Sequence, residues 1–368
     1  MRRWITTFAR YDWSLLIAAM ALTAIGVLVL FGIGLARESQ DLFQVKKQLL
    51  GAGIGLALAV AISLTDYRHL RALALPIYAG GLALLVGVLV LGTTHRNGGR
   101  WFVLGALSFQ PVELAKLTFV IFLAAYFSRH AHTRLTWTAF AGSAFALLAY
   151  VVPVLFQPDF GSAMVFIAIW LAMTFFCRLP RHAWWSLLLT FVTIATFLWM
   201  VGLKPYQRER ITTFFSPYAD PYGASYNVAQ ARIAIGSGGW FGKGIGEGSQ
   251  ARLRFLPEAS TDFIFAVVGE ELGFVGVSVV LFLLGLLLTR IIRIAMESQD
   301  AFAGLCLIGI ASVIAFHLFV NAGMNLGIMP VTGIPLPFVS AAASSLIVLF
   351  LSIGIVEAVA VHVKGTFA

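Results

Sequence analysis

The stretch LPEASTDFIFAVVGEELGFVGVSVVLFLLGLLL, residues 256–288, is a long apolar run that opens with a carboxylate. Asp262 stands near its start, and Glu270 and Glu271 follow about two helical turns later. The run is long enough to cross the roughly 30 Å hydrocarbon core of a membrane, and we expect a helix at 262–288. It contains no lysine or arginine, so nothing nearby in the sequence neutralises these acids.

The composition of the whole chain agrees with a membrane protein. Hydrophobic residues make up 60% and charged residues 11%, with a mean hydropathy of +0.91, whereas about a quarter of a soluble domain is charged. The first apolar run, 13–35, is too long for a secretory signal and lacks a small-residue cleavage site, so we expect it to be retained as a helix. The two cysteines, Cys177 and Cys306, fall in predicted membrane spans, which argues against a disulfide framework and a thiolate metal site.

We predict an all-α integral membrane protein, a single polytopic domain over residues 1–368 with about ten transmembrane helices. The expected helices are 13–35, 48–64, 72–92, 112–128, 137–156, 160–177, 183–202, 262–288, 301–324 and 343–362. Alternation of sides places both termini on the face whose short loops hold twelve cations, against five on the other face. Short cytoplasmic loops carry the excess of Lys and Arg, so both termini are predicted to be cytoplasmic.

One extracytoplasmic connection, residues 203–261 between the seventh and eighth predicted helices, is far longer than an ordinary loop. Its cations outnumber its acids, and a basic face toward anionic lipid headgroups is one explanation. A site for an anionic substrate is the other. The cations are Lys204, Arg208, Arg210, Arg232, Lys243, Arg252 and Arg254, against Glu209, Asp220, Glu247 and Glu258.

Within this loop, GSGGWFGKGIGEG (236–248) is rich in glycine but does not fit a phosphate-binding P-loop. Ser237 stands where the P-loop needs its first Gly, and Gly244 where it needs Ser or Thr. We interpret the stretch as a backbone that can approach a ligand closely, with nearby cations supplying charge. The preceding residues, 224–235, are expected to form a short helix at the membrane interface.

Charged residues inside a predicted helix need a reason, because ionisable side chains are costly in a membrane. Glu113 and Lys116 lie three residues apart at the start of the helix at 112–128, so they share a face and can pair. The pair either neutralises itself as a structural element or contacts a substrate. Asp159, in the motif QPDFG, falls at a helix junction, where capping of a helix N-terminus competes with substrate binding.

A polar stripe of His317, Asn321 and Asn325 recurs every four residues along the ninth predicted helix. Hydrogen bonds between helices explain such a stripe, and a polar lining for a substrate is the alternative. The segment MPVTGIPLPF, residues 329–338, has three prolines and cannot form a regular helix. At membrane depth such a backbone must line a cavity or be buried in protein. These features predict a polar cleft, open to the outside, for an anionic amphiphile.

Five stretches, taken in this order, resemble the bacterial SEDS family (shape, elongation, division and sporulation) over nearly the whole chain. They are NGGRWFVLGALSFQPVELAK, QPDFGSA, AIGSGGWFGKGIGEGSQ, FLPEASTDFIFAVVGEELGF and NAGMNLGIMPVTGIPLPFVS. The Gly-rich stretch followed by FLPE and TDFIF is most similar to the elongation branch, RodA, rather than to the division branch, FtsW.

The resemblance implies a ten-helix peptidoglycan glycosyltransferase of the bacterial inner membrane, active in cell-wall biogenesis and cell shape. Its expected substrate is lipid II, the disaccharide-pentapeptide carried on undecaprenyl diphosphate. Its expected partner is a class B penicillin-binding protein, a transpeptidase that crosslinks the product. No nucleic acid is expected to bind.

The resemblance also assigns residues. The family's essential aspartate matches Asp262, its second outer loop matches Arg100 and Gln110, and its intramembrane pair matches Glu113 and Lys116. We therefore predict Asp262 as the catalytic residue. The predicted substrate-binding residues are Arg100, Gln110, Glu113, Lys116, Asp159, Arg210, Lys243, Arg252, His317 and Asn321.

The implied reaction replaces an α-linked diphosphate by a β-linked sugar, which means inversion in one displacement. It needs a general base for the attacking hydroxyl and stabilisation of the leaving diphosphate. Asp262 is the candidate base, while basic residues or a divalent cation, Mg²⁺ or Mn²⁺, would take the diphosphate charge. No metal ligands can be identified from the sequence, so Asp262 is a candidate both as base and as cation ligand.

A structural role for Asp262 is the alternative to a catalytic one. Ser260, Thr261 and Asp262 form a good helix start, and an acid in the first turn gains roughly 0.3–1 kcal/mol from the helix dipole. One departure from the family also stands out. After PFVS the family continues with an aromatic residue and two glycines, but here 341–343 are alanines, which puts the last outer loop and the tenth helix in doubt.

Other functions stay open at this stage. A lipid II flippase or another transporter would also need many helices and a polar cavity. Transporters often show paired broken helices in two repeated halves, and the segment at 329–338 has no convincing mate in the first half. A division paralogue of the FtsW type is a further alternative, and a scaffold without chemistry would leave Asp262 without a role.

Overall fold

The computed structural model describes residues 10–35, 42–94, 100–104, 107–130, 135–177, 185, 224–253 and 255–366. Within these residues the chain is a bundle of long helices, eight of them long and apolar enough to cross a membrane. These are α2 (Trp13–Leu35), α3 (Phe43–Ser63), α5 (Ala74–Leu91), α6 (Pro111–Ser128), α7 (Trp137–Phe156), α13 (Ile264–Glu297), α14 (Ala301–Leu326) and α15 (Ala343–Thr366). A shorter apolar helix, α8 (Phe160–Phe175), runs beside them.

The predicted membrane helices are confirmed within the described residues, with shifts at some ends. The third element of the prediction, 72–92, splits into the short α4 (Arg68–Ala72) and α5. Helix α3 begins at Phe43 rather than at 48, and α13 continues to Glu297 rather than ending at 288. The helix predicted at 183–202 lies outside the described residues.

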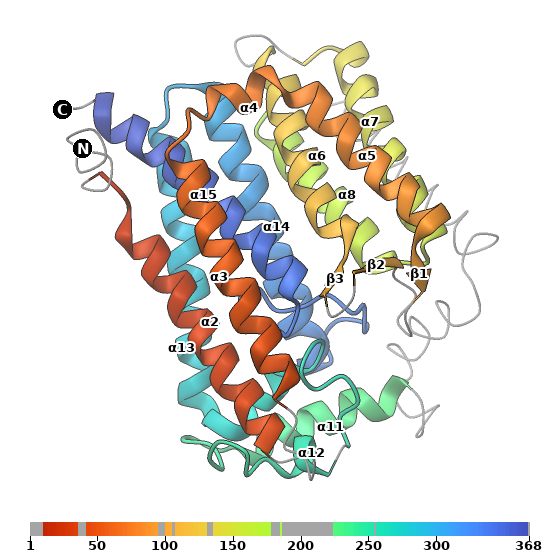
Figure 1. Cartoon of the computed structure of the whole chain (residues 1–368), viewed down its shortest axis with the longest axis vertical. Helices are drawn as coiled ribbons and strands as arrows, with labels where there is room; N and C mark the ends of the chain where they lie inside the picture. The colour runs from red at the N-terminus through yellow and green to blue at the C-terminus, as the bar shows by residue number, and fades with distance from the viewer. Residues whose placement is uncertain are drawn as a thin grey trace.

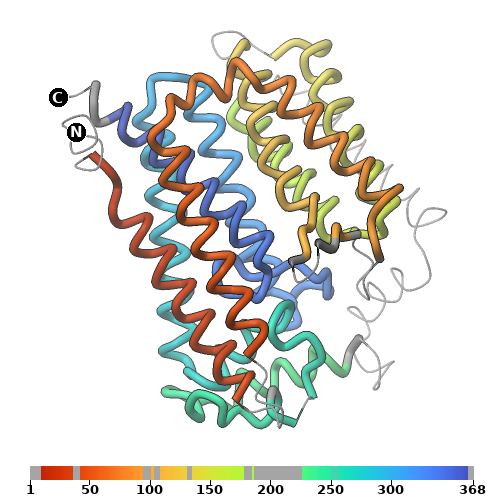
Figure 2. Tube along the Cα trace, viewed as in Figure 1, coloured from red at the N-terminus to blue at the C-terminus, as the bar shows by residue number. Residues whose placement is uncertain are grey.

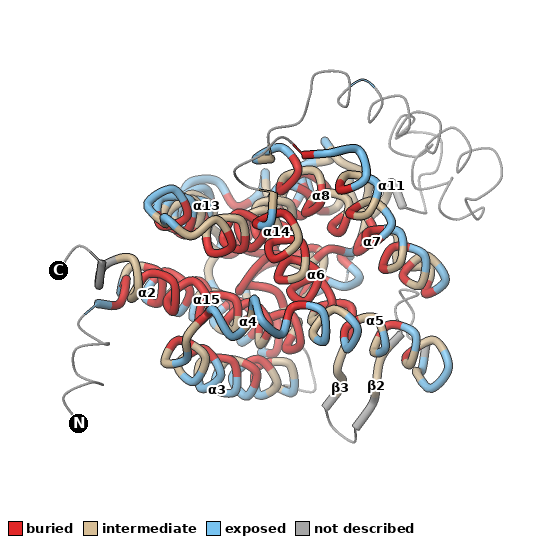
Figure 3. Tube along the Cα trace, turned by 90° about the horizontal axis from the view of Figure 1, so that it is seen from above, coloured by how far each residue is buried: buried red, intermediate tan, exposed pale blue. Residues whose placement is uncertain are grey.

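The most deeply buried helices are α6 and α15, which lie at the centre of the bundle. Helix α15 packs along α3, while α6 packs against α5 and α14. Helix α13 contacts both α2 and α14. Figure 3, seen along the bundle, shows buried residues facing inward and exposed residues on the outward faces of α3, α5 and α13. The outward faces are apolar because their solvent is lipid rather than water.

One end of the bundle, which we call the loop face, carries all the short elements except α4 (Figure 1). They are β1 (Thr93–Thr94), β2 (Arg100–Leu104), β3 (Leu107–Phe109), α11 (Ala224–Ser237) and α12 (Ser249–Arg252). The three strands pair in the order β1-β2-β3 as an antiparallel meander, a small sheet that the all-α prediction did not include. Helix α2 begins and α15 ends at the opposite end of the bundle (Figure 2).

Helix α13 is broken at Gly273, whose φ of 67° and ψ of −163° lie outside the helical region. Residues 238–250, which we call the clasp loop, dock at this break. In a regular helix the amides of Phe274 and Val275 would donate to the carbonyls of Glu270 and Glu271. Here the two amides donate to carbonyls of the clasp loop, and the loop amides of residues 243 and 244 donate to the two helix carbonyls instead.

The alanines at 341–343 fit this backbone without strain. None of them is among the described residues with positive φ, so the positions do not require glycine here. The Ala341 amide donates to the Ser260 carbonyl at 2.8 Å, and Ala343 is the first residue of α15. Gly51 of α3 faces Ala343, and a Cβ added at Gly51 would lie 3.1 Å from the Ala343 Cβ. The small residue on α3 thus makes room for the methyl group on α15.

Candidate functional site

Asp262 lies in a turn on the loop face, just before α13 begins. Its amide donates to the Glu258 carbonyl at 3.1 Å, and its side chain is partly exposed. Helix α13 begins at Ile264 with Phe263 as its N-cap residue, no capping side-chain bond from that residue and no acid in the first turn. Asp262 therefore precedes the first turn of α13, and its expected first-turn position is wrong.

The backbone of this turn is held by α14. The side-chain amides of Asn321 and Asn325 both donate to the Asp262 carbonyl, at 3.0 and 3.1 Å. Asn321 also donates to the Ile334 carbonyl at 2.8 Å, which ties the proline-rich segment to the same point. The polar stripe of α14 thus makes the predicted interhelical hydrogen bonds, and these bonds place Asp262.

The proline-rich segment after α14 covers the other side of the turn. The Ser340 hydroxyl donates to the Thr261 carbonyl at 2.6 Å and accepts from the Leu336 amide at 2.8 Å. Gly333 lies beside the Asp262 carboxylate, because a Cβ added at Gly333 would stand 3.5 Å from an Asp262 Oδ2 atom. The expectation that this backbone is buried in protein or lines a cavity agrees with its contact with the Asp262 turn.

A buried charged cluster lies deeper in the bundle, between α6 and α14. The Lys116 ammonium donates to Glu113 at 2.7 Å and to the Nε2 atom of His317 at 3.2 Å. All three side chains are buried, and a small cavity beside them is also lined by Ser345 of α15. Because lysine can only donate, Nε2 of His317 accepts and the neutral ring carries its proton on Nδ1.

The charged cluster and the Asp262 turn share one face of α14. His317 and Asn321 are four residues apart, so they follow one another on one face of the helix, about one turn apart. One end of this stripe contacts Lys116 and the next position contacts Asp262. The structure therefore brings five predicted site residues, Glu113, Lys116, Asp262, His317 and Asn321, into one continuous chain of contacts.

Two further predicted residues lie at helix starts near this cluster. Asp159 caps α8 and accepts hydrogen bonds from the Ser162 amide at 2.9 Å and hydroxyl at 2.8 Å, so the predicted capping role is confirmed. Burial raises the pKa of the Asp159 carboxyl, and the Ser162 hydrogen bonds oppose that shift. Gln110 is the N-cap residue of α6, and its backbone amide donates to the Ser344 hydroxyl at 3.3 Å.

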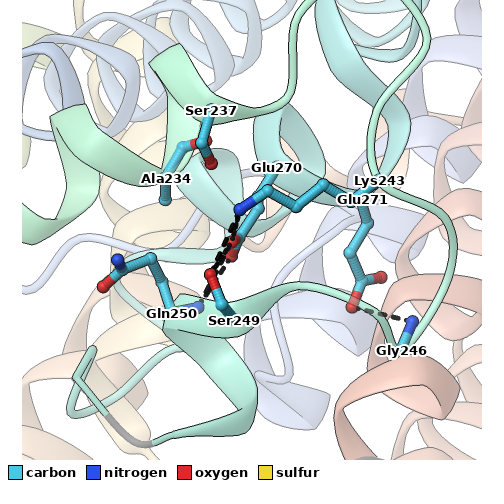
Figure 4. A network of polar contacts seen from close by, with 8 residues as sticks. All are labelled: Ala234, Ser237, Lys243, Gly246, Ser249, Gln250, Glu270 and Glu271. Atoms are coloured by element: carbon cyan, nitrogen blue, oxygen red, sulfur yellow. Dashed lines mark hydrogen bonds and ion pairs between the residues drawn. The ribbon is translucent and has the colours of Figure 1, made fainter.

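Lys243, in the clasp loop, forms an ion pair with Glu270, a buried acid of α13 (Figure 4). The Lys243 ammonium lies 2.8 Å from the Glu270 carboxylate, which also accepts from the Ser249 hydroxyl and the Gln250 backbone amide. Glu271 accepts from the Gly246 amide at 3.1 Å. These contacts account for the Gly-rich loop and for Lys243 without a ligand.

Three of the predicted substrate-binding cations are not seen to contact the Asp262 turn or the buried charged cluster within the described residues. Arg252 is exposed and lies 3.9 Å from Glu247. Arg100 belongs to β2, but its side chain and the whole of Arg210 lie outside what the structure describes. Within the described residues no three His, Cys, Asp or Glu side chains form a metal-binding group.

Some residues of the site were missed by the sequence analysis. Gln48 of α3 is buried, and its side-chain amide donates to the carbonyls of Phe338 and Ser340, at 3.4 and 3.0 Å. An amide at the first position of the helix predicted at 48–64 was the available signal for Gln48. Ser340 follows the proline-rich segment, and its role depends on contacts with residues about eighty positions earlier that no local pattern reveals.

The comparisons with known proteins agree on one family. Residues 12–365 match the family of cell cycle proteins that includes FtsW, RodA and SpoVE. The probable peptidoglycan glycosyltransferase FtsW of Geobacter sp. (strain M18) is 34% identical over 363 residues, which cover 96% of this chain and 98% of the relative. The peptidoglycan glycosyltransferase MrdB of Escherichia coli (strain K12) is 34% identical over 359 residues, covering 96% and 94%.

Solved structures give the same result. A chain from a peptidoglycan synthase complex, described as coordinating polymerization and crosslinking, has a TM-score of 0.80 and 36% identity. The match covers 95% of this chain and 97% of that one. The crystal structure of the rod shape determining protein RodA of Thermus thermophilus has a TM-score of 0.69 and 34% identity, covering 95% and 96%.

Proposed function

This chain belongs to the FtsW, RodA and SpoVE family, and we propose that it polymerises lipid II with Asp262 as the catalytic carboxylate. It is a multi-pass membrane protein, and its relatives in two branches of the family are named peptidoglycan glycosyltransferases. The matches cover nearly the whole length of these relatives, which supports the proposal.

One observation carries the role of Asp262. Its backbone is held by two asparagines of α14, and its carboxylate lies beside Gly333 of the proline-rich segment. A side chain on a fixed backbone, at a partly exposed position on the loop face, fits a group that meets a substrate. Precise placement is what a general base needs, because it must lie within hydrogen-bond reach of the proton it removes.

The proposed step forms one bond and breaks one. The 4-hydroxyl oxygen of one sugar attacks the anomeric carbon of another, and its proton passes to the Asp262 carboxylate. The bond from that carbon to the diphosphate oxygen breaks, and undecaprenyl diphosphate leaves with the electron pair. Attack from the face opposite the leaving group converts the α linkage into a β linkage.

The leaving diphosphate must be stabilised electrostatically. We assign this role to the predicted cations Arg100 and Arg210. Lys116, Lys243 and Arg252 have carboxylate partners of their own and are left out of the proposed contacts to the diphosphate. Mg²⁺ commonly binds through one or two protein carboxylates together with substrate phosphates, so Asp262 with the diphosphate would suit Mg²⁺ or Mn²⁺. Such a cation would neutralise charge on the leaving group.

We further propose the setting of this reaction. The loop face is assigned to the extracytoplasmic side of the bacterial inner membrane, which places both termini in the cytoplasm in agreement with the positive-inside rule. The partner is proposed to be a class B penicillin-binding protein, since a structural relative is part of a peptidoglycan synthase complex. The similarity of the Gly-rich stretch and FLPE to the elongation branch supports a role in elongation.

Polymerisation of labelled lipid II by the purified chain tests the proposal. We expect glycan strands to form, more rapidly with the partner than without it. One undecaprenyl diphosphate should be released for each new glycosidic bond between disaccharides. A transporter would move lipid II across vesicles without forming strands. Release of undecaprenyl diphosphate without strand growth, or no product with any penicillin-binding partner of the same organism, would contradict the proposal.

A further inference from the structure

The N-cap residue of helix α13, Phe263, makes no capping hydrogen bond through its side chain. The first amides of a helix have no partner inside the helix, and a side chain at the N-cap usually binds the amide of the third helical residue. With Phe263 as the N-cap residue, that third residue is Ala266. Its amide donates to Oδ1 of Asn325, on α14, at 3.1 Å. The Ala266 amide also donates to the Phe263 carbonyl at 3.0 Å. Asn325 therefore adds, from another helix, the side-chain acceptor that a local Ser, Asp or Asn would otherwise offer.

The same side chain also binds the residue that carries the proposed chemistry. Nδ2 of Asn325 donates to the Asp262 carbonyl at 3.1 Å and to the Asn321 carbonyl at 2.8 Å. The Asn325 side chain is completely buried, so water does not compete for these bonds. The amide can only stand one way round, because turning it over would set Oδ1 against two carbonyls and Nδ2 against the Ala266 N–H.

We infer that Asn325 is a positioning residue for Asp262, acting through the backbone of the turn. The inference rests on the proposed catalytic role of Asp262. By capping α13 and holding the Asp262 carbonyl with one amide, Asn325 fixes where the helix begins and where the preceding carboxylate stands. The Asp262 carboxylate, placed in this way, lies beside Gly333.

The end of α14 that carries Asn325 is itself anchored from the large loop. Arg232 of α11 donates through Nε to the Leu326 carbonyl and through Nη2 to the Gly327 carbonyl, each at 3.0 Å. These carbonyls belong to the last turn of α14, where helical hydrogen bonds end and the chain otherwise frays. The fork of arginine suits two neighbouring acceptors. The Arg232 contact thus holds the helix end in the position from which Asn325 reaches Asp262.

Two substitutions separate the positioning role from plain capping. Asn325→Ala removes both contacts. Asn325→Asp keeps an acceptor for the Ala266 amide, but its ionised form cannot donate to the Asp262 carbonyl. An ionised aspartate is also a good cap, since it accepts a hydrogen bond at the positive end of a helix. Capping alone therefore predicts that Asn325→Asp works as well at high pH as at low pH, whereas positioning predicts that its activity, relative to wild type, falls as the pH rises.

The experiment measures lipid II polymerisation by the full chain with its penicillin-binding partner, together with thermal unfolding. For Asn325→Ala we expect kcat to fall by about tenfold to 10²-fold, as for a misplaced catalytic group, with KM within about twofold. Thr136→Ala is the matched control, because Thr136 caps α7 through the Ala139 amide and does not contact the Asp262 turn. It should lower the unfolding temperature and leave kcat unchanged.

Three results would overturn the inference, and one of them also removes its premise. A kcat for Asn325→Ala within about twofold of wild type would overturn it. So would a pH-independent activity ratio for Asn325→Asp, which also decides the matter if Asn325→Ala does not fold. Asp262→Asn is run beside them. Near-normal turnover of Asp262→Asn would contradict the proposed function itself, whereas an inactive Asp262→Asn with a fully active Asn325→Ala would overturn this inference alone.

Discussion

Glu113 and Lys116 form an ion pair inside the bundle. Both side chains are buried and their charged atoms lie 2.7 Å apart. A buried ion pair adds little net stability, because the attraction between the charges is offset by the loss of their hydration. Removal of one partner is different, since it leaves the other charge buried and uncompensated. Each of the two charged side chains therefore needs the other for the folded protein to stay stable.

Lys116→Met should destabilise the protein by about 3–5 kcal/mol because Glu113 loses its counter-ion. The double variant Glu113→Gln with Lys116→Met should recover part of that loss, since no bare charge remains. Thermal unfolding of the purified protein in one detergent measures both. A single variant as stable as wild type would show that the pair is not a coupled buried pair.

Residue-level sequence reasoning found the site more readily than its connections. The chemistry-bearing residues Glu113, Lys116, His317 and Asn321 were predictable, because polar groups are conspicuous in apolar helices. The first-turn position expected for Asp262 was wrong, and the side-chain acceptor for the Ala266 amide comes from Asn325, about sixty residues later in the chain. A cap supplied from another helix leaves no local signal. The amide at Asn325 was visible in the sequence, but its partners were not.

At the scale of the element, α13 depends on the clasp loop. The loop replaces two backbone hydrogen bonds that the helix loses at Gly273, so the break is bridged rather than left open. Buried, unpaired backbone groups would be costly in a membrane protein. The Lys243–Glu270 ion pair adds a side-chain contact to the same junction. The break and the loop are therefore one structural unit.

Gly273 offers a direct test of this unit. A Cβ at Gly273 would lie 2.3 Å from the Gly242 amide nitrogen, and φ is 67°, which a side chain rarely adopts. Gly273→Ala should release the clasp loop and cost more than about 1 kcal/mol from backbone strain alone. Limited proteolysis within 238–250 should become faster. Gly285→Ala, in the same helix with nothing within 4 Å, is the control and should change neither stability nor cleavage adversely. Equal cleavage of the two variants would contradict the account.

The membrane helices were predictable and the short elements were not, for physical reasons. A run of about twenty apolar residues has few alternatives to a membrane helix, so α2 and α7 match their predicted bounds. The strands β1 and β3 have two and three residues, too few for a periodic pattern. The break in α13 was hidden because Gly273 is one glycine among many, and only the docked loop makes its conformation necessary.

The whole molecule has two distinct ends (Figure 1). Helix α2 begins and α15 ends at one of them, and the loop face lies at the other. A substrate that reaches the enzyme from outside, as proposed, requires an extracytoplasmic loop face. The excess of cations in short loops of the other face gives the same orientation. The proposed substrate and the distribution of cations therefore predict the same orientation of the protein in the membrane.

Single cysteines can read this orientation in intact cells. In a chain with Cys177 and Cys306 replaced by serine, Glu247→Cys on the loop face should react with a membrane-impermeant maleimide. Gln299→Cys, in the exposed loop between α13 and α14, should react only after the cells are opened. Both native residues are exposed, so access to the reagent depends on the side of the membrane. The reverse labelling pattern would place the site in the cytoplasm and contradict the proposed substrate.

The whole account depends on Asp262, and its polymerisation rate after Asp262→Asn is the most direct measurement. Asparagine keeps the size and polarity of the side chain but removes its charge and its capacity to accept a proton. A general base typically contributes about 10²–10⁴-fold, or about 3–5 kcal/mol of transition-state stabilisation. We predict a well-folded, partner-bound variant whose lipid II turnover falls by that factor. A variant of wild-type stability that still polymerises lipid II at nearly the wild-type rate would contradict the catalytic role of Asp262.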